Sequence, residues 1–168
     1  MKRATAVLLG VFCCFTILIG IASAADKFAF VDLGRAFNEY KKTKDYDKVL
    51  ADKESLYETE RNKKVADIKQ YQDKMNLLSD KEKEAKRPEL ETKIKSLQES
   101  DRQKQVDLRK EFNEKRAEVL KDIDNAIRQN AQSGGYTLVF NEAGVLYNAK
   151  SLDITDQILD ALNKGYKK

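Results

Sequence analysis

The longest stretch of the chain without helix-breaking residues most constrains its fold. Between Lys41 and Gln132 the sequence contains no glycine and a single proline, Pro88. Two helices are predicted, roughly over residues 41–78 and 88–131, because only the region between them favours a turn. At a rise of ~1.5 Å per residue, each helix would be ~60 Å long. The pattern therefore predicts a long antiparallel helical hairpin.

Apolar side chains recur along both predicted helices at heptad-like spacing. Leu50, Tyr57, Tyr71 and Leu78 occupy one heptad position, and Lys64 interrupts it. If the hairpin folds near residues 79–88, it pairs Tyr71 with Leu97 and Tyr57 with Phe112, and it places Arg61 and Lys64 opposite Asp101 and Lys104. The turn itself has two candidates. Ser79 with Glu82 forms a capping-box motif, and Pro88 suits the first turn of a helix.

The N-terminus has the pattern of an export signal. Met1-Lys2-Arg3 is basic, residues 4–21 are uncharged and largely apolar, and Ala22-Ser23-Ala24 is a small-x-small cleavage site. Residues 1–24 are predicted to be a cleaved signal peptide, with an uncleaved membrane anchor as the alternative. Cleavage removes both cysteines, Cys13 and Cys14. Loss of Lys2 and Arg3 also lowers the formal net charge from +4 to +2.

The segments on either side of the hairpin predict a small α+β base. Phe28 to Leu33 is an aromatic and β-branched strand pattern, and residues 35–40 predict a short helical turn. After the helix stop at Ser133-Gly134-Gly135, residues 136–140 and 145–148 predict a β-hairpin, and Asp153 precedes a final amphipathic helix. The chain therefore divides into a base, residues 25–40 and 132–168, and a helical hairpin arm, residues 41–131.

The base has few residues for a core of its own, so several chains are predicted to share one core. The mature sequence has no cysteine to form a disulfide. The residues predicted to form the shared core are apolar and lie on or beside the predicted strands. They are Phe28, Phe30, Val31, Leu138, Val139, Phe140 and Leu146.

The sequence offers little for catalysis. It has no histidine, no cysteine after the predicted cleavage site and no glycine-rich phosphate loop. Its many carboxylates lie beside lysines at helical spacing, which is typical of solvated helix faces. We therefore expect no enzyme, no catalytic residue, no metal site and no cofactor.

Some apolar arm residues exceed what a strict two-helix seam requires. Tyr57, Tyr71, Met75 and Leu77 are the candidates for contact with other proteins, because thioether and phenol side chains adapt to varied partners. The near-balanced charge disfavours a polyanion-binding protein, which remains an alternative.

Two local patterns resemble the Skp/OmpH family of periplasmic chaperones. The first is Phe30-Val31-Asp32-Leu33-x-Arg35-x-Phe37-Asn38-Glu39-Tyr40. The second runs from Gly135 to Tyr147 and is followed by Leu152-Asp153-Ile154-Thr155-Asp156. The resemblance implies a homotrimer in which strands from three chains form a shared barrel and three helical hairpins enclose a cavity.

The resemblance also implies an ATP-independent holdase that keeps unfolded outer-membrane β-barrel proteins soluble in the periplasm. Tyr57, Tyr71, Met75 and Leu77 would then be client-binding residues. Other partners to consider are membrane lipid or lipopolysaccharide, for which no basic motif places a site, and no nucleic acid is expected. The alternative is a structural coiled-coil adaptor or spacer of the cell envelope without client-holding activity.

Overall fold

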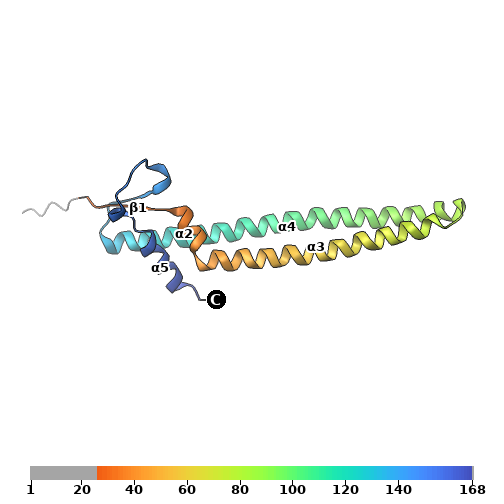
Figure 1. Cartoon of the computed structure of the whole chain (residues 1–168), viewed down its shortest axis with the longest axis horizontal. Helices are drawn as coiled ribbons and strands as arrows, with labels where there is room; N and C mark the ends of the chain where they lie inside the picture. Colours follow the sequence, from red (N-terminus) through yellow and green to blue (C-terminus); the bar gives the residue numbers. More distant parts are fainter. Residues whose placement is uncertain (1–25, 168) are drawn as a thin grey trace, which may run out of the picture.

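The computed structural model describes residues 26–167, so the predicted signal peptide lies outside the described residues. A long helical hairpin extends from a small base (Figure 1). Its arms are α3 (Lys41–Asn76) and α4 (Asp80–Gly134), of 36 and 55 residues. The predicted helical hairpin on a small β-strand base is confirmed. Within residues 26–167, no helix is both long and apolar enough to cross a lipid bilayer.

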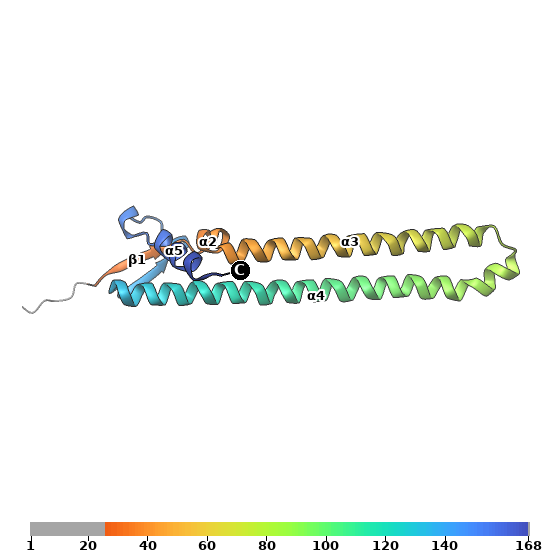
Figure 2. The ribbon, with the colours of Figure 1, turned by 90° about the horizontal axis from the view of Figure 1, so that it is seen from below.

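The hairpin turn is set by Ser79. The backbone N–H of Ser79 donates to Oε2 of Glu82 at 3.0 Å, and α4 begins at the next residue. This capping box satisfies donors that a helix N-terminus leaves free. Pro88 lies inside α4, so the alternative turn is wrong. Figure 2 shows this end of α4 bent toward α3, as expected where a proline removes a helical hydrogen bond.

Two short strands form the sheet of the base. Strand β1 (Phe28–Val31) pairs in parallel with β2 (Leu138–Asn141), and Phe30 lies opposite Phe140. Parallel strands need a long crossover connection, which here is the entire helical hairpin. The predicted β-hairpin of residues 136–148 is therefore wrong, because β2 pairs with β1 and residues 145–148 form no strand.

The chain leaves β2 through a side-chain turn that directs it away from the sheet. Oδ1 of Asn141 accepts the N–H of Ala143 at 3.3 Å, and the 3₁₀ helix η1 (Glu142–Gly144) follows. Local Asn bonds of this kind compete with continued strand pairing. A second 3₁₀ helix, η2 (Lys150–Leu152), follows this loop.

Two predicted helix boundaries are confirmed and one is shifted. Helix α2 (Leu33–Glu39) begins two residues before the predicted turn of residues 35–40, because the side chain of Asp32 caps it by accepting the N–H of Arg35 at 2.9 Å; Leu33 is therefore helical and not part of the predicted strand. Helix α4 ends before Gly135, which has a φ of 65°, a conformation that glycine adopts without strain. Helix α5 (Thr155–Gly165) follows Asp153, whose Oδ1 accepts the N–H of Thr155 at 2.8 Å.

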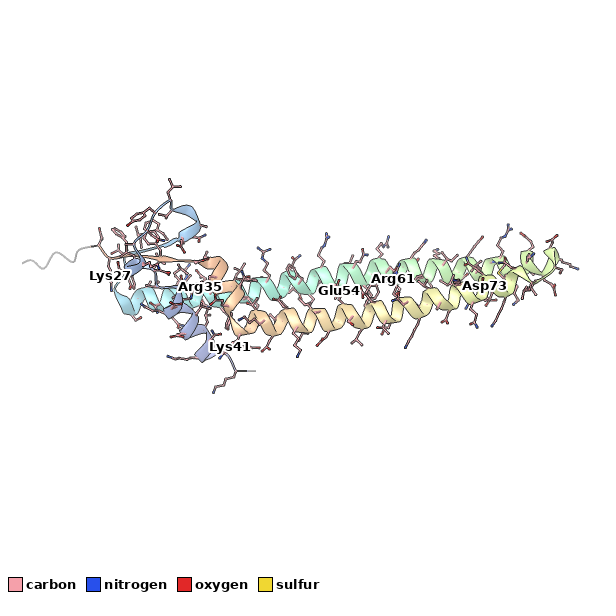
Figure 3. The ribbon with its side chains drawn as sticks, viewed as in Figure 1. Lys27, Arg35, Lys41, Glu54, Arg61 and Asp73 are labelled. Atoms are coloured by element: carbon pink, nitrogen blue, oxygen red, sulfur yellow. The ribbon has the colours of Figure 1, made fainter. Side chains whose placement is uncertain are left out.

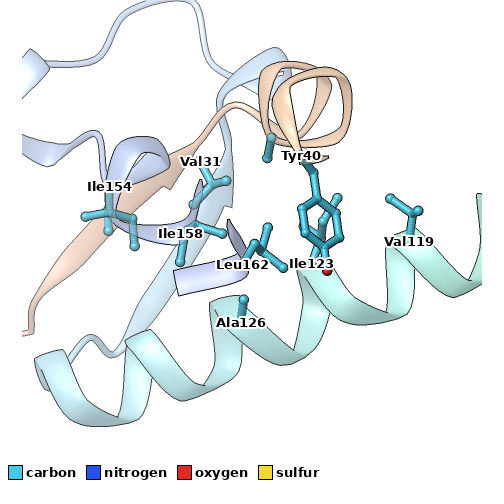
Figure 4. Packing of buried hydrophobic residues seen from close by; sticks show 10 residues of the cluster. Val31, Tyr40, Val119, Ile123, Ala126, Ile154, Ile158 and Leu162 are labelled. Atoms are coloured by element: carbon cyan, nitrogen blue, oxygen red, sulfur yellow. The ribbon is translucent and has the colours of Figure 1, made fainter. Parts of the chain in front are cut away.

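The core of the base lies where β1, α2, the last turns of α4 and α5 meet (Figure 4). Val31, Ile123, Ile154 and Ile158 are each at most 2% exposed. Val119, Ile123 and Ala126 belong to α4, so the end of the predicted arm segment also contributes to the base. One chain therefore has a small core of its own. Val31, predicted to face other chains, is covered within it.

Candidate functional site

The two arms are joined by hydrogen bonds from tyrosines of α3 to carboxylates of α4. Tyr46 donates to Glu118 at 2.8 Å. Farther from the base, Tyr57 donates to Asp101 and Tyr71 donates to Glu89, both at 2.6 Å. Bonds to ionised acceptors are stronger than neutral ones, so these contacts fix the relative positions of the arms. We call these three pairs the tyrosine ladder.

Ion pairs between the arms follow the same alignment. Lys53 reaches Glu111 at 2.5 Å, and Arg61, labelled in Figure 3, reaches Asp101 at 3.0 Å. Next to them, Nζ of Lys64 donates to Ser100 at 3.0 Å. Of the expected facing of Arg61 and Lys64 with Asp101 and Lys104, the contact of Arg61 with Asp101 is confirmed, whereas Lys64 contacts Ser100. Partly exposed pairs of this kind contribute little stability individually, but each favours one register.

Two predicted apolar pairings of the hairpin are wrong. Tyr57 reaches Asp101 where Phe112 was expected, and Tyr71 reaches Glu89 where Leu97 was expected. Helix α4 is therefore shifted along α3 relative to the predicted alignment. The reason is that polar contacts, which the heptad pattern does not describe, decide the alignment.

The apolar side chains of the arms remain open to solvent. Between Lys44 and Glu118 no described residue is buried. A cavity of about 730 Å³ lies between the distal halves of the arms. Its apolar lining comes from both helices: Val65, Ile68, Met75, Leu90, Ile94 and Leu97. We call this feature the distal groove.

The predicted contact residues occupy different environments. Tyr57 and Tyr71 are half-buried, and their hydroxyl groups belong to the tyrosine ladder. Met75 lines the distal groove, and Leu77 is 87% exposed at the hairpin tip. The structure thus brings Met75 together with apolar residues of α4 that were not among the predicted contact residues. The signal for them was the helical spacing of Leu90, Ile94 and Leu97.

A second apolar surface covers the outer face of the base sheet. Alternation along β1 buries Ala29 and Val31, and it leaves Phe28 40% exposed. The rings of Phe30 and Phe140 stack with centroids 5.6 Å apart, and Leu138 is 51% exposed on the neighbouring strand. We call these side chains, Phe28, Phe30, Leu138 and Phe140, the aromatic face. Val139 instead packs against the core, and Leu146 is fully exposed in the loop.

The ladder carboxylates have lowered pKa values. Hydrogen bonds from Lys42 and then Tyr46 lower the pKa of Glu118 to about 2. The hydroxyl of Tyr57 lowers the pKa of Asp101, and the hydroxyl of Tyr71 lowers that of Glu89. Each of these hydrogen bonds favours the ionised carboxylate. The tyrosine ladder is therefore fully formed at neutral pH, where all three carboxylates are ionised.

Replacing Glu118 by Gln is expected to destabilise the root of the arm by ~1 kcal/mol or less, the scale of partly exposed ion pairs. Since folding lowers the pKa of Glu118, its stabilisation is complete above pH 4.5 and is lost as the pH falls toward about 2. The stability difference between wild type and Glu118→Gln should therefore shrink over that window. Chemical unfolding monitored by circular dichroism measures it.

Glu114→Gln is the matched control for this experiment. Glu114 lies on the same helix and makes only a 3.9 Å pair with Lys110. It should leave the pH dependence of wild type unchanged. A Glu118→Gln protein whose stability follows that of wild type through the whole window would contradict the assignment.

The described residues offer no evident site for metal chemistry. Among residues 26–167, no three His, Cys, Asp or Glu side chains are grouped so that they could hold a metal ion. The arms and the base sheet instead expose extended apolar surface, which is typical of protein interaction sites.

Comparison with known proteins identifies the family and a similar fold. The family described as "Outer membrane protein (OmpH-like)" matches residues 27–162. The fold is similar to the crystal structure of a putative outer membrane chaperone (OmpH-like) from Caulobacter crescentus CB15. The TM-score is 0.79 at 16% sequence identity, over 85% of this chain and 87% of that chain. No curated protein matches. Because the family match spans nearly all the described residues, the chain belongs to the OmpH-like family.

Proposed function

We propose that this protein is an ATP-independent holdase, which binds unfolded outer-membrane β-barrel proteins in the periplasm and prevents their aggregation. The observation that carries the proposal is the open arm. A hairpin that left its apolar seam half-exposed along its length would be a liability unless that surface bound something. Family membership supports the chaperone role, and the predicted signal peptide supports export to the periplasm.

The chemistry of the distal groove suits many clients. An unfolded barrel strand presents apolar side chains at a period of two residues, which no helix face can match residue for residue. Capture must then rest on many shallow contacts, without a fixed register. Flexible Met75 and the branched side chains of the groove can provide such contacts, with Tyr57, Tyr71 and Leu77 as further client-binding residues.

The aromatic face supports assembly into a homotrimer. Phe28, Leu138 and Phe140 are each at least 40% exposed in one chain. Full burial of a large apolar side chain from an exposed state stabilises by ~1.5 to 3 kcal/mol, and roughly half of each of these is still exposed, so a shared barrel of strands would contribute about half that amount per side chain. Three arms mounted on one base would then surround a client. Membrane lipid or lipopolysaccharide is a further candidate partner, without an assigned site.

An aggregation assay tests the proposal. An unfolded outer-membrane β-barrel protein is diluted from urea with and without the mature chain, and light scattering is followed. The holdase should suppress scattering without ATP, and it should do so for several unrelated barrels. Scattering that is unchanged for every barrel would contradict the proposal.

One observation favours a second function, a coiled-coil adaptor or spacer of the cell envelope. Leu77 is 87% exposed at the hairpin tip, where one folded partner could dock. An adaptor should bind that partner at the tip and leave unfolded barrels to aggregate. Leu77→Asp would then abolish partner binding, whereas it should barely affect a holdase.

A further inference from the structure

The root of the arm contains a one-residue joint. Helix α2 ends at Glu39 and α3 begins at Lys41, so Tyr40 alone makes the change of direction. Its backbone is extended, with φ −63° and ψ 127°. Single joints of this kind absorb the dihedral changes of hinge motions. The direction of α3 therefore depends on what holds the residues around Tyr40.

The end of α5 holds this joint through three contacts. The N-cap residue of α3, Tyr40, does not cap the helix with its own side chain. Instead, Oδ1 of Asn163 in α5 accepts the N–H of Lys41 at 2.9 Å. The rings of Tyr166 and Tyr40 meet edge to face with centroids 5.8 Å apart. The hydroxyl of Tyr166 donates to Asp45 at 3.2 Å, one turn into α3.

The joint is also tied to α4. Nζ of Lys42 contacts both Glu118 and Asp122 at 2.7 Å, and the hydroxyl of Tyr40 donates to Asp122 at 3.3 Å. Beside these contacts lies an open cavity of about 610 Å³, lined in part by Tyr40, Lys42 and Tyr166. Tyr40 itself is 4% exposed in the core of the base, and the contacts of Asn163 and Tyr166 add to this packing at the root of α3.

We propose that the last turn of the chain is a latch that sets the direction of the arm, by fastening the root of α3 to the base through Asn163 and Tyr166. Helix α4 runs without interruption from the core of the base into the arm, so it is one strut. A single helix bends, whereas two struts fixed at separate points resist bending. The latch makes α3 the second strut.

The length of the arm amplifies small changes at its root. At ~1.5 Å per residue α3 is ~54 Å long, so a rotation of ~10° at Tyr40 moves the tip by ~9 Å. The three latch contacts thus control the position of the tip and the spacing of neighbouring arms in any assembly. This inference concerns the direction of the arm and does not depend on the proposed client binding.

Distances between two spin labels, measured by double electron–electron resonance spectroscopy, test the latch. Labels at Lys81→Cys near the tip and Lys150→Cys in the base report the arm's direction, and both sites are exposed. Residues 26–167 contain no cysteine, so the labels have no background there. Labelled chains are diluted with unlabelled protein, so that only distances within one chain contribute.

Two latch variants and one control decide the outcome. A chain ending at Lys164 loses Tyr166, and the full-length double variant Asn163→Ala with Tyr166→Phe removes the hydrogen bonds to Lys41 and Asp45. Each should broaden or shift the distance distribution, by up to ~9 Å for the truncation. Tyr147→Phe changes a tyrosine that is 84% exposed, and it should match wild type.

The fold of each variant is checked by circular dichroism. If truncation unfolds α5, the full-length double variant decides alone. Wild-type distributions in the folded latch variants would overturn the proposal. The proposal would also be overturned if the distance distribution of the control, Tyr147→Phe, broadened as much as those of the latch variants.

Discussion

Shortening both arms by matched segments is expected to abolish the suppression of aggregation while leaving the base folded. Deleting residues 54–74 and 90–110 removes most of the distal groove, including Ile68 and Leu97. The Lys53–Glu111 pair and the capping box at Ser79 remain. Each deletion spans whole heptads, so the remaining seam keeps its alignment. Light scattering of an unfolded barrel protein measures the loss.

A single substitution is the matched control for this deletion. Tyr71→Ala removes one ring and its bond to Glu89, and it should lower holdase activity only slightly if contacts are distributed. Sedimentation should show the same assembly for both variants, because the aromatic face is unchanged. If Tyr71→Ala alone abolished activity with helicity intact, a discrete binding site would have to replace the distributed one.

Replacing Phe140 by Asp is expected to prevent assembly of the base. Phe140 is 42% exposed in one chain and stacks on Phe30, at the centre of the aromatic face. A carboxylate there would be buried between chains without a partner, at a cost of several kcal/mol. Sedimentation velocity should show monomers in place of the trimer proposed for wild type. Leu138→Asp should act in the same way.

Val49→Asp is the control for the added charge. Val49 is 46% exposed, close to the exposure of Phe140, but it lies on α3 away from the sheet. It should leave assembly unchanged. Helicity of Phe140→Asp should stay near that of wild type, because the chain's own core is not altered. A trimer that survived Phe140→Asp would show that the aromatic face does not mediate assembly.

The helices were predictable because their signals are local. The absence of glycine between Lys41 and Gln132 predicts the long arms, and the capping box at Ser79 was one of two candidates for the turn before α4, the one that the structure confirms. The apolar face of α5, with Ile158 and Leu162 buried, also follows from helical spacing. Each of these features depends on residues close together in the sequence.

The sheet was not predictable in the same way. A short strand followed by Asn141 to Gly144 resembles a β-hairpin, yet β2 finds its partner at the other end of the chain. Parallel pairing between strands separated by the whole arm gives no signal in the sequence near either strand. The sequence therefore indicated the strand β2 correctly and its neighbour wrongly.

The details of the candidate site depend on side-chain geometry between distant segments. Heptad spacing groups the apolar residues of the arms, but the hydrogen bonds of Tyr57 and Tyr71 to α4 set the register. The latch is harder still to foresee, since Asn163 and Lys41 meet only in the folded chain.

Methyl-resolved NMR with an unfolded barrel protein tests the central claim, that the open arms hold clients by many shallow contacts. Val65, Ile68, Ile94 and Leu97 report the distal groove, and buried Ile123 and Ile158 in the base serve as internal controls. The account predicts broad, small perturbations spread over the groove methyls, with the two control signals unchanged. Perturbations confined to one point, or absent from the arms, would contradict it.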